Sequence, residues 1–261
     1  MSNAPNASTR ETKRFRIWLL PYQLVVLVVF CLITPLTGFV CFIAAVFDGR
    51  GDHAHKCLRY WARVCLGVAR LDIQVCGLER LDTGKTYVFM PNHGSFLDIL
   101  LTLAYIPQNF RFIILWKLFY NPLLNLALRC SHQLPIDQTS PRQSLKTLQR
   151  AMDLLEEKVS IVVFPEGGRS RTGDLQKFKT MVFVLPTRAR VPVVPVLIEG
   201  AFAALRRGQV LIRPMGIRLT FLDPVVNEFG DMDRSMCAAR VRAALCDAIR
   251  VRRRAADQIS S

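Results

Sequence analysis

The residues of this chain whose types and spacing could do acid–base chemistry are a histidine and an aspartate, His93 and Asp98. Five residues of an α-helix turn through about 500°, so the two side chains would lie on different faces of one helix. They can meet only if His93 lies in a loop and Asp98 lies in the first turn of the next helix. Gly94 and Ser95 favour that arrangement, because glycine loosens a loop and serine is a common N-cap.

The chemistry of such a pair would be general base catalysis. Asp98 would fix the tautomer of His93 at one ring nitrogen and leave the other nitrogen to take a proton from a substrate hydroxyl. The alternative is a capping box formed by Ser95 and Asp98, with His93 as an ordinary loop residue, and such boxes are common. Ser95 as a covalent nucleophile would indicate a hydrolase, but the G-x-S-x-G elbow is missing.

A second loop has the composition of an anion-binding site. Phe164–Ser170 leaves a β-rich run through two glycines and carries Arg169. Glycines let backbone N–H groups approach an anion, and a guanidinium group offers a fork of donors that suits phosphate. The loop therefore predicts a site for a phosphate or another anionic group.

The elements that must position these loops alternate between strands and helices. A helix is expected over Asp98–Tyr105, and a second helix begins at Ser140, which is followed by proline and, three residues after the cap, by Gln143. Two prolines within Val191–Val196 favour an edge strand or a specialised wall of a site. This alternation predicts an α/β fold with the site at the carboxyl ends of the strands. The expected strands are Leu71–Val75, Tyr87–Met90, Phe110–Trp116, Ser160–Phe164 and Val191–Ile198.

The composition narrows the class of partner. Hydrophobic residues make up 51% of the 261 residues, and 35 Lys and Arg against 20 Asp and Glu give a net charge of +15. So much apolar surface excludes a disordered chain, and the positive balance favours polyanions. No nucleic-acid-binding module is recognisable, so a membrane surface is the expected partner rather than nucleic acid. No metal site is predicted, because no second cluster completes the possible ligands between Asp52 and Cys57.

An uncharged run from Ile17 to Phe47 suggests how the chain meets that membrane. As one helix the run would measure about 46 Å, against a hydrocarbon core of about 30 Å. Pro35 is expected to divide it into two helices, Ile17–Thr34 and Leu36–Phe47. Basic residues flank both ends, which favours a hairpin in one leaflet, on the cytoplasmic face of the cell membrane, over a tilted span. A buried pair of helices in a soluble protein is the remaining alternative.

The expected organisation has four parts. Residues 1–14 form a polar tail, residues 15–48 a membrane-associated helical segment, residues 49–225 the catalytic domain, and residues 226–261 a basic helical tail. That tail ends in a cluster of arginines, Arg250 and Arg252–Arg254, which fits either binding to anionic lipid or a solvated helix face.

Four segments, in this order, resemble the motifs of the glycerolipid acyltransferase family of the 1-acyl-sn-glycerol-3-phosphate acyltransferase type. They are Pro91–Asp98, Leu134–Gln138, Phe164–Ser170 and Val191–Val196. The resemblance implies the αβ glycerolipid-acyltransferase fold with an N-terminal membrane-embedded helical hairpin. It also implies transfer of a fatty acyl group from acyl-CoA or acyl-carrier protein to the hydroxyl of a lysolipid, with lysophosphatidate as the default acceptor.

The resemblance also implies roles for individual residues. His93 and Asp98 correspond to the catalytic pair of the family, and Glu166, Gly167 and Arg169 correspond to its acceptor-binding residues. A basic residue often precedes the second motif, and in this chain Lys117 is the candidate. No cofactor or metal is implied, because a thioester is already activated.

Three positions depart from the family pattern. Gln138 stands where the second motif usually ends in arginine, Gly168 where threonine usually precedes Arg169, and Met181 where glycine is usual. The loss of a guanidinium group at position 138 makes a lyso-aminolipid, such as lyso-ornithine lipid, an alternative acceptor. A catalytically silent, lipid-binding relative is a further alternative.

Overall fold

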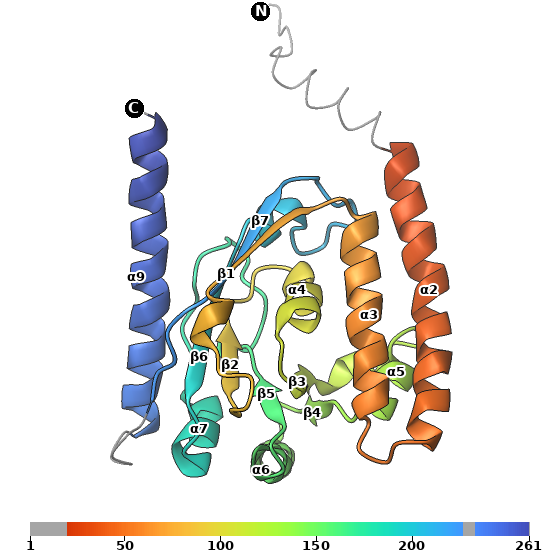
Figure 1. The fold of residues 1–261 in the computed structure, drawn as a ribbon, viewed down its shortest axis with the longest axis horizontal. Helices are drawn as coiled ribbons and strands as arrows, with labels where there is room; N and C mark the ends of the chain where they lie inside the picture. The colour runs from red at the N-terminus through yellow and green to blue at the C-terminus, as the bar shows by residue number, and fades with distance from the viewer. Residues whose placement is uncertain (1–19, 227–232, 261) are drawn as a thin grey trace, which may run out of the picture.

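The computed structural model describes residues 20–226 and 233–260, so the polar tail expected over residues 1–14 lies outside the described residues. Within them the chain forms one seven-stranded sheet with helices packed around it (Figure 1). Neighbouring strands are parallel, except that β6 and β7 are antiparallel. The strand order is β1 (Asp72–Cys76), β7 (Gly216–Phe221), β6 (Val193–Glu199), β2 (Val88–Pro91), β5 (Ser160–Val162), β3 (Phe110–Leu115) and β4 (Leu134–Ile136).

Helices cover both faces of this sheet. Their bounds are α2 Leu20–Val46, α3 Asp52–Val68, α4 Leu97–Tyr105, α5 Asn125–Cys130, α6 Pro141–Glu156, α7 Val184–Ala189, α8 Ala201–Ala204 and α9 Arg234–Ser260. Short 3₁₀ turns cover Leu78–Arg80 (η1), Trp116–Tyr120 (η2) and Thr180–Phe183 (η3). Side chains alternate along each strand, so Phe89 of β2 packs with α3 and α4, while Val88 and Met90 pack with α6 and α9.

The predicted α/β fold is confirmed, and five of the strands lie within two residues of their predicted bounds. The strand that contains Pro195 does not lie at an edge, however, because β6 sits between β7 and β2. A proline is tolerated there because the pairing with the next segment is interrupted. An isolated bridge joins Val193 to Val225, and regular pairing resumes only at Val196 with Phe221. The two paired segments have unequal numbers of residues between these points, which is a β-bulge. The N–H that Pro195 lacks therefore breaks no hydrogen bond between the strands.

The expected division of the apolar segment at Pro35 is wrong. Pro35 lies inside α2, which is one continuous helix of 27 residues. The buried Thr34 donates its hydroxyl to the Phe30 carbonyl at 2.5 Å and accepts a hydrogen bond from Trp61 Nε1 at 3.2 Å. Packing against α3 and α5 therefore holds the helix together where its own hydrogen bonding is interrupted.

A hairpin does exist at this end of the chain, but α2 forms it with α3. The Tyr22 hydroxyl near the start of α2 donates to the Val68 carbonyl at 2.6 Å. Near the other end, Cys41 Sγ lies 3.4 Å from the Ala54 carbonyl oxygen. The two helices thus pack side by side and antiparallel, as Figure 1 shows. The predicted boundary between residues 48 and 49 consequently falls in the turn of the hairpin.

The C-terminal helix is more than the expected basic tail. Its first half belongs to the core, because Cys237, Val241 and Leu245 are buried between the helix and the sheet. Residues 251–255 of the helix are exposed, and Arg252 makes an ion pair with Glu199 of β6 at 3.3 Å. The globular domain therefore extends past the predicted boundary at residue 225, and α9 covers one face of the sheet.

Candidate active site

The loop between β2 and α4 is anchored to the sheet by the residue before the histidine. Asn92 Nδ2 donates to the Ile198 carbonyl at 3.0 Å, and Asn92 Oδ1 accepts from the Ile198 N–H at 2.7 Å. The side-chain amide thus continues the pairing of β2 with β6 beyond Pro91. This fixes the direction in which the chain enters the loop.

His93 lies in that loop and Asp98 lies in the first turn of α4, as the sequence predicted. His93 Nδ1 is 2.9 Å from Asp98 Oδ2, and the same oxygen accepts the backbone N–H groups of Gly94 and Ser95 at 2.7 Å each. The Asp98 side chain is almost fully buried, with 1% of the residue exposed. Ser95 Oγ also accepts the Leu97 N–H at 3.2 Å. The Asp98 carboxylate therefore does both things at once: it accepts the backbone N–H groups before α4 and it pairs with His93.

This arrangement selects one tautomer of the histidine. An ionised carboxylate can only accept hydrogen bonds, so Nδ1 of His93 must be the donor to Asp98. Nε2 is then left with its lone pair, as a general base requires. The ring is stacked on Phe164, with 4.0 Å between centroids and 22° between planes. The Ser95 hydroxyl donates to the Leu205 carbonyl at 2.8 Å, so it is engaged in loop packing rather than poised as a nucleophile.

Glu166 holds the backbone of His93 from the opposite side. Glu166 Oε1 accepts the His93 N–H at 2.8 Å, and Oε2 accepts the Gln176 N–H at 3.1 Å. The Ser170 N–H donates to the His93 carbonyl at 2.7 Å, so both backbone groups of the histidine are fixed by this loop. Burial raises the pKa of the Glu166 carboxyl, and the two N–H donors offset part of that shift. Glu166 is thus placed as a brace for the loop rather than as a ligand.

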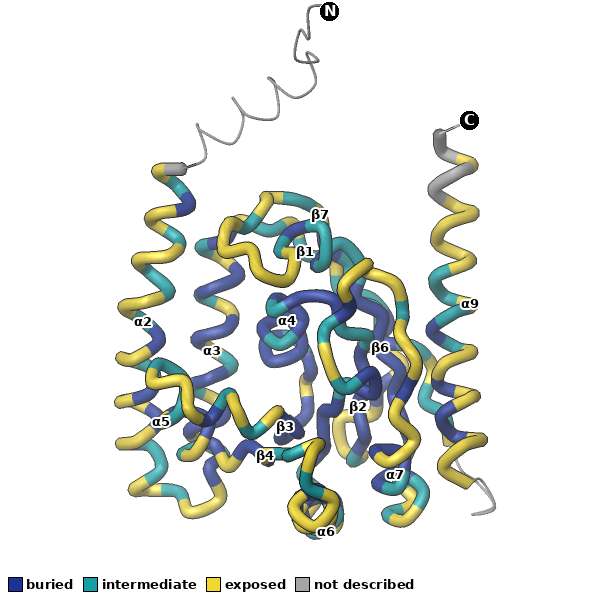
Figure 2. The backbone as a smooth tube through the Cα atoms, turned by 180° about the vertical axis from the view of Figure 1, so that it is seen from behind, coloured by how far each residue is buried: buried dark blue, intermediate teal, exposed yellow. Residues whose placement is uncertain are grey.

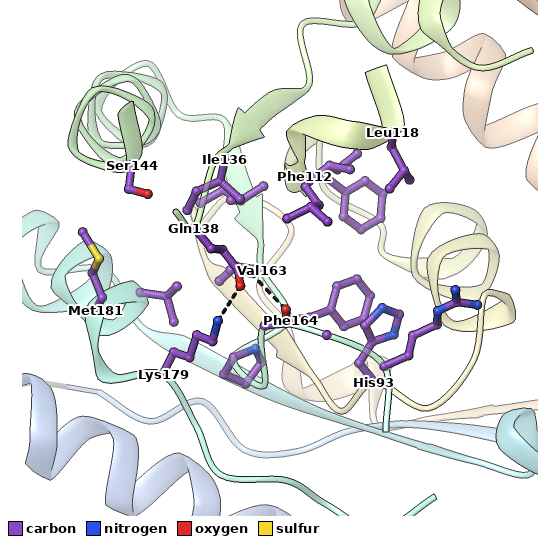
Figure 3. A pocket seen from close by; sticks show the side chains of 18 of the residues that line it. His93, Phe112, Leu118, Ile136, Gln138, Ser144, Val163, Phe164, Lys179 and Met181 are labelled. Carbon is purple, nitrogen blue, oxygen red and sulfur yellow. Dashed lines mark hydrogen bonds between the residues drawn. The ribbon is translucent and has the colours of Figure 1, made fainter. Parts of the chain in front are cut away.

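One of the two glycines, Gly167, allows a lysine to approach the loop. Gly167 has φ +72°, and a Cβ atom there would lie 2.6 Å from Lys179 Cε. Lys179 Nζ hydrogen-bonds Gln138 Oε1, and Gln138 Nε2 donates to the Gly167 carbonyl at 2.9 Å (Figure 3). Gln138 therefore holds an ammonium group beside the Gly-rich loop, at the position where the family pattern has a guanidinium group.

These side chains border a cavity of about 510 Å³ at the carboxyl ends of β2 and β5. Polar and charged side chains line part of the cavity, namely those of His93, Gln138, Ser144, Arg169, Lys179 and Arg207. Apolar side chains line the rest, and Figure 3 shows Phe112, Leu118 and Ile136 among them. Within the described residues, no hydrogen bond or ion pair engages the Arg169 guanidinium, so its donors are available to an anion. The apolar lining includes Phe112, Ile113, Leu118, Ile136, Leu148, Val163, Met181 and Val182.

The predicted site residues take different positions around this cavity. His93, Gly167 and Arg169 line it, whereas Asp98 and Glu166 support the lining from behind. Among the residues that the structure describes, Lys117 is not one of those that line the cavity. Its Nζ lies 5.9 Å from the centre of the Trp116 ring.

Two cations of the cavity were missed by the sequence analysis. Lys179 belongs to the segment around Met181 that already resembles a family stretch, so its position offered a signal. Arg207 follows α8 and reaches the cavity only because the chain folds back there, so no local pattern could have identified it.

Comparison with known proteins agrees with the four motifs. The family model described as Acyltransferase matches residues 72–199. A chloroplastic 1-acyl-sn-glycerol-3-phosphate acyltransferase of Brassica napus is 30% identical over 215 residues, which cover 78% of this chain and 62% of that protein. A chloroplastic enzyme of the same description from Arabidopsis thaliana is 31% identical, and the match covers 68% of this chain and 50% of the relative. The chain spans about half to two-thirds of the length of these curated relatives.

A solved structure has the same fold. The crystal structure of the 1-acyl-sn-glycerophosphate acyltransferase PlsC from Thermotoga maritima superposes with a TM-score of 0.76, over 90% of this chain and 97% of that chain. The sequence identity between the two is 20%. The arrangement of sheet and helices described above is therefore one that a solved acyltransferase structure shares.

The role of Glu166 as a brace can be tested through stability. Glu166→Ala would leave the half-buried N–H group of His93 without its acceptor, at about 1–3 kcal/mol, and would also remove the acceptor of the more exposed Gln176 N–H. The free energy of unfolding, measured by chemical denaturation, should fall by that order, while Glu156→Ala on the exposed face of α6 should change it little. A Glu166→Ala protein as stable as the wild type, with only a weaker affinity for acceptor, would instead make Glu166 a ligand.

Proposed function

Because this chain belongs to the glycerolipid acyltransferase family, we propose that it transfers a fatty acyl group from a thioester to 1-acyl-glycerol-3-phosphate, forming phosphatidic acid. The observation that carries the proposal is the pair of His93 and Asp98 beside a cavity that is lined by both cationic and apolar side chains. Acyl-CoA or acyl-carrier protein is the donor, and no cofactor is needed because the thioester is already activated.

The reaction is a direct transfer without an acyl-enzyme. His93 Nε2 takes the proton of the acceptor hydroxyl while the hydroxyl oxygen attacks the thioester carbonyl carbon. The new C–O bond forms, the C–S bond breaks, and the proton passes from the imidazolium to the departing sulfur. Asp98 stabilises the imidazolium through Nδ1. General base catalysis of this kind contributes about 10²–10⁴-fold to the rate.

The charges of the cavity support a phosphate-bearing acceptor. A phosphate monoester carries a charge of about −1.5 to −2 at neutral pH, and Arg169, Lys179 and Arg207 all line the cavity. From the sequence, a lyso-aminolipid was an alternative acceptor, because Gln138 stands where the family pattern has a cationic arginine. In the structure the Gln138 amide holds the Lys179 ammonium in that region, so the cationic character is retained. Lysophosphatidate is therefore the acceptor that the site favours.

The apolar side chains that line the same cavity suit the acyl chain of the donor. Ile136, Leu148 and Met181 line it, and burying a methylene group contributes about 0.8 kcal/mol. A thioester carbonyl near His93 would direct its chain into this region. Donor and acceptor then meet at the histidine with their reacting atoms held together, which reduces the entropic cost of the encounter.

We also propose that α2 attaches the protein to a membrane by lying in one leaflet. The helix is long and apolar enough to cross a bilayer by length and composition alone. Figure 2 shows that its outer side is largely exposed, and Leu32, Leu36 and Phe39 are among the exposed side chains. A crossing would draw the antiparallel α3 into the hydrocarbon, with its exposed Lys56 and Arg63.

An in-plane position avoids that cost. The apolar outer side of α2 would enter one leaflet, and the catalytic domain would stay at the surface. Basic residues on both sides of the apolar segment in the sequence favour the cytoplasmic face of the cell membrane.

The proposed reaction is tested by incubating the purified protein in detergent with labelled acyl-CoA and lysophosphatidate. His93→Ala should lower kcat by about 10²–10⁴-fold, because it removes the base. His53→Ala is the matched control, since that histidine is exposed and pairs only with Asp48. Labelled phosphatidic acid is quantified by chromatography. Equal turnover by wild type and His93→Ala would rule out this mechanism, and no product with acyl-CoA or acyl-carrier protein would indicate a catalytically silent protein.

The acceptor assignment is tested by removing the free guanidinium. Arg169→Ala should raise the KM for lysophosphatidate roughly tenfold or more, because hydrogen bonds to charged groups contribute about 1.5–3 kcal/mol. Arg171→Ala, at an exposed position two residues along the same loop, should leave that KM unchanged. A lyso-ornithine lipid is assayed in parallel. If it were the better substrate and were insensitive to Arg169→Ala, the phosphate assignment would be wrong.

Membrane attachment is tested by sedimentation with lipid vesicles. Leu32→Glu should weaken binding to the vesicles roughly tenfold, which corresponds to about 1.4 kcal/mol, because a charge replaces an apolar contact with lipid. Leu145→Glu is the control, since Leu145 is a similarly exposed leucine on α6. Equal binding by the two variants would mean that α2 is not the attachment site.

A further inference from the structure

A second cavity, of about 340 Å³, lies between α2 and the catalytic loop. Its walls are mostly apolar, and Arg169 is the one charged residue in its described lining. Four half-buried residues of α2 form one wall: Val26, Val29, Phe30 and Ile33. The opposite wall comes from α3, α4 and the segment after α8, with Cys65, Phe96, Leu97, Leu100, Leu205 and Ile212.

The two cavities meet at the same arginine. Arg169 lines both of them, so this residue adjoins the first cavity, with its several cations, and the mostly apolar second cavity. The segment after α8 also serves both, because Arg207 lines the first cavity while Leu205 and Ile212 line the second. A ligand whose anionic group bound Arg169 could therefore extend into either space.

The walls of the second cavity are fixed to one another by specific contacts. The Gln23 side chain is 6% exposed, and its amide bonds both backbone groups of Ile212, accepting from the N–H at 3.0 Å and donating to the carbonyl at 2.5 Å. Phe30 of α2 packs edge-on against Phe96, directly before α4, with 6.3 Å between ring centroids. These contacts tie the apolar helix to the loop that carries His93.

We propose that this second cavity receives the acyl chain of the acceptor, an inference that rests on the proposed function. The acceptor has one phosphate, one free hydroxyl and one chain. With its phosphate at Arg169 and its hydroxyl at His93, the chain needs a path that the chain of the donor does not occupy. The second cavity provides that path, and an apolar lining would disfavour a polar headgroup there.

The chain would enter from the lipid side. α2 forms one wall of the cavity with one side and exposes apolar residues such as Val25 and Leu32 with the other. Because α2 alone would separate the leaflet from the cavity, a lysolipid would have to move past this helix to place its phosphate at Arg169. The leaflet and the cavity are both apolar, so the acyl chain meets similar surroundings in each. A side chain that blocked the cavity would therefore act by steric exclusion of the acyl chain. The excluded chain would displace the hydroxyl of the acceptor from His93.

The first test fills the cavity. Val26→Trp places a large side chain in it, and Val25→Trp, on the exposed side of α2, is the matched control. The acceptors are lysophosphatidates with an oleoyl or a hexanoyl chain, with one acyl-CoA as donor. Val26→Trp should lower kcat/KM for the oleoyl acceptor by about tenfold or more, and that for the hexanoyl acceptor by less than about twofold. An equal loss with both acceptors, or with both variants, would overturn the proposal.

The second test detects binding without turnover. A lysophosphatidate that carries a photoreactive diazirine at the end of its chain is irradiated with the full-length protein, in the absence of donor. Labelled peptides are mapped by mass spectrometry. Label within residues 23–33 or 205–212 that is lost in Val26→Trp is the expected result. Label around residues 136–148, on the outer side of α2 only, or nowhere would overturn the proposal. Cavity labelling in a protein that forms no product would refute the proposed reaction but not this binding site.

Discussion

One oxygen atom, Oδ2 of Asp98, holds the site together. It accepts the ring N–H of His93 and two consecutive backbone N–H groups of the loop before α4, in surroundings that exclude most water. A buried donor without an acceptor is costly, so the conformation of the loop and the tautomer of His93 depend on the same charge. The atom that fixes the loop before α4 therefore also orients the ring of the histidine.

The sheet brings a second loop to the other side of that histidine. β2 and β5 are parallel neighbours, so the loops that follow them leave the same edge of the sheet. Glu166 and Ser170 can then hold the N–H and carbonyl groups of His93 although they lie more than 70 residues away. Phe164 stacks on the ring at the same place. The orientation of His93 is thus a property of the strand order, which brings the loops after β2 and β5 into contact.

The parts of this site that the sequence could predict are those that local geometry determines. His93 and Asp98 can meet only across a loop and a first helical turn, so their spacing, with Gly94 and Ser95 between them, predicted the pair, although it left a capping box as the alternative. The role of Glu166 was not accessible, because its partners are backbone groups that the sheet brings close. Pro35 misled for a similar reason, since contacts with α3 and α5 override the local tendency of proline to end a helix. Arg207 reaches the cavity only through the fold.

The position of Arg169 between two cavities bears on the end of the catalytic cycle. In the proposed reaction, joining the two substrates would create one molecule with two acyl chains, one in each of the cavities that Arg169 lines, and a headgroup still held by that arginine. Such a product would straddle the arginine, so it could depart only after both tails had withdrawn. Product release would then be favoured by a leaflet that can receive both acyl chains at once. The surrounding lipid would therefore set the rate at which the site becomes free for the next substrates.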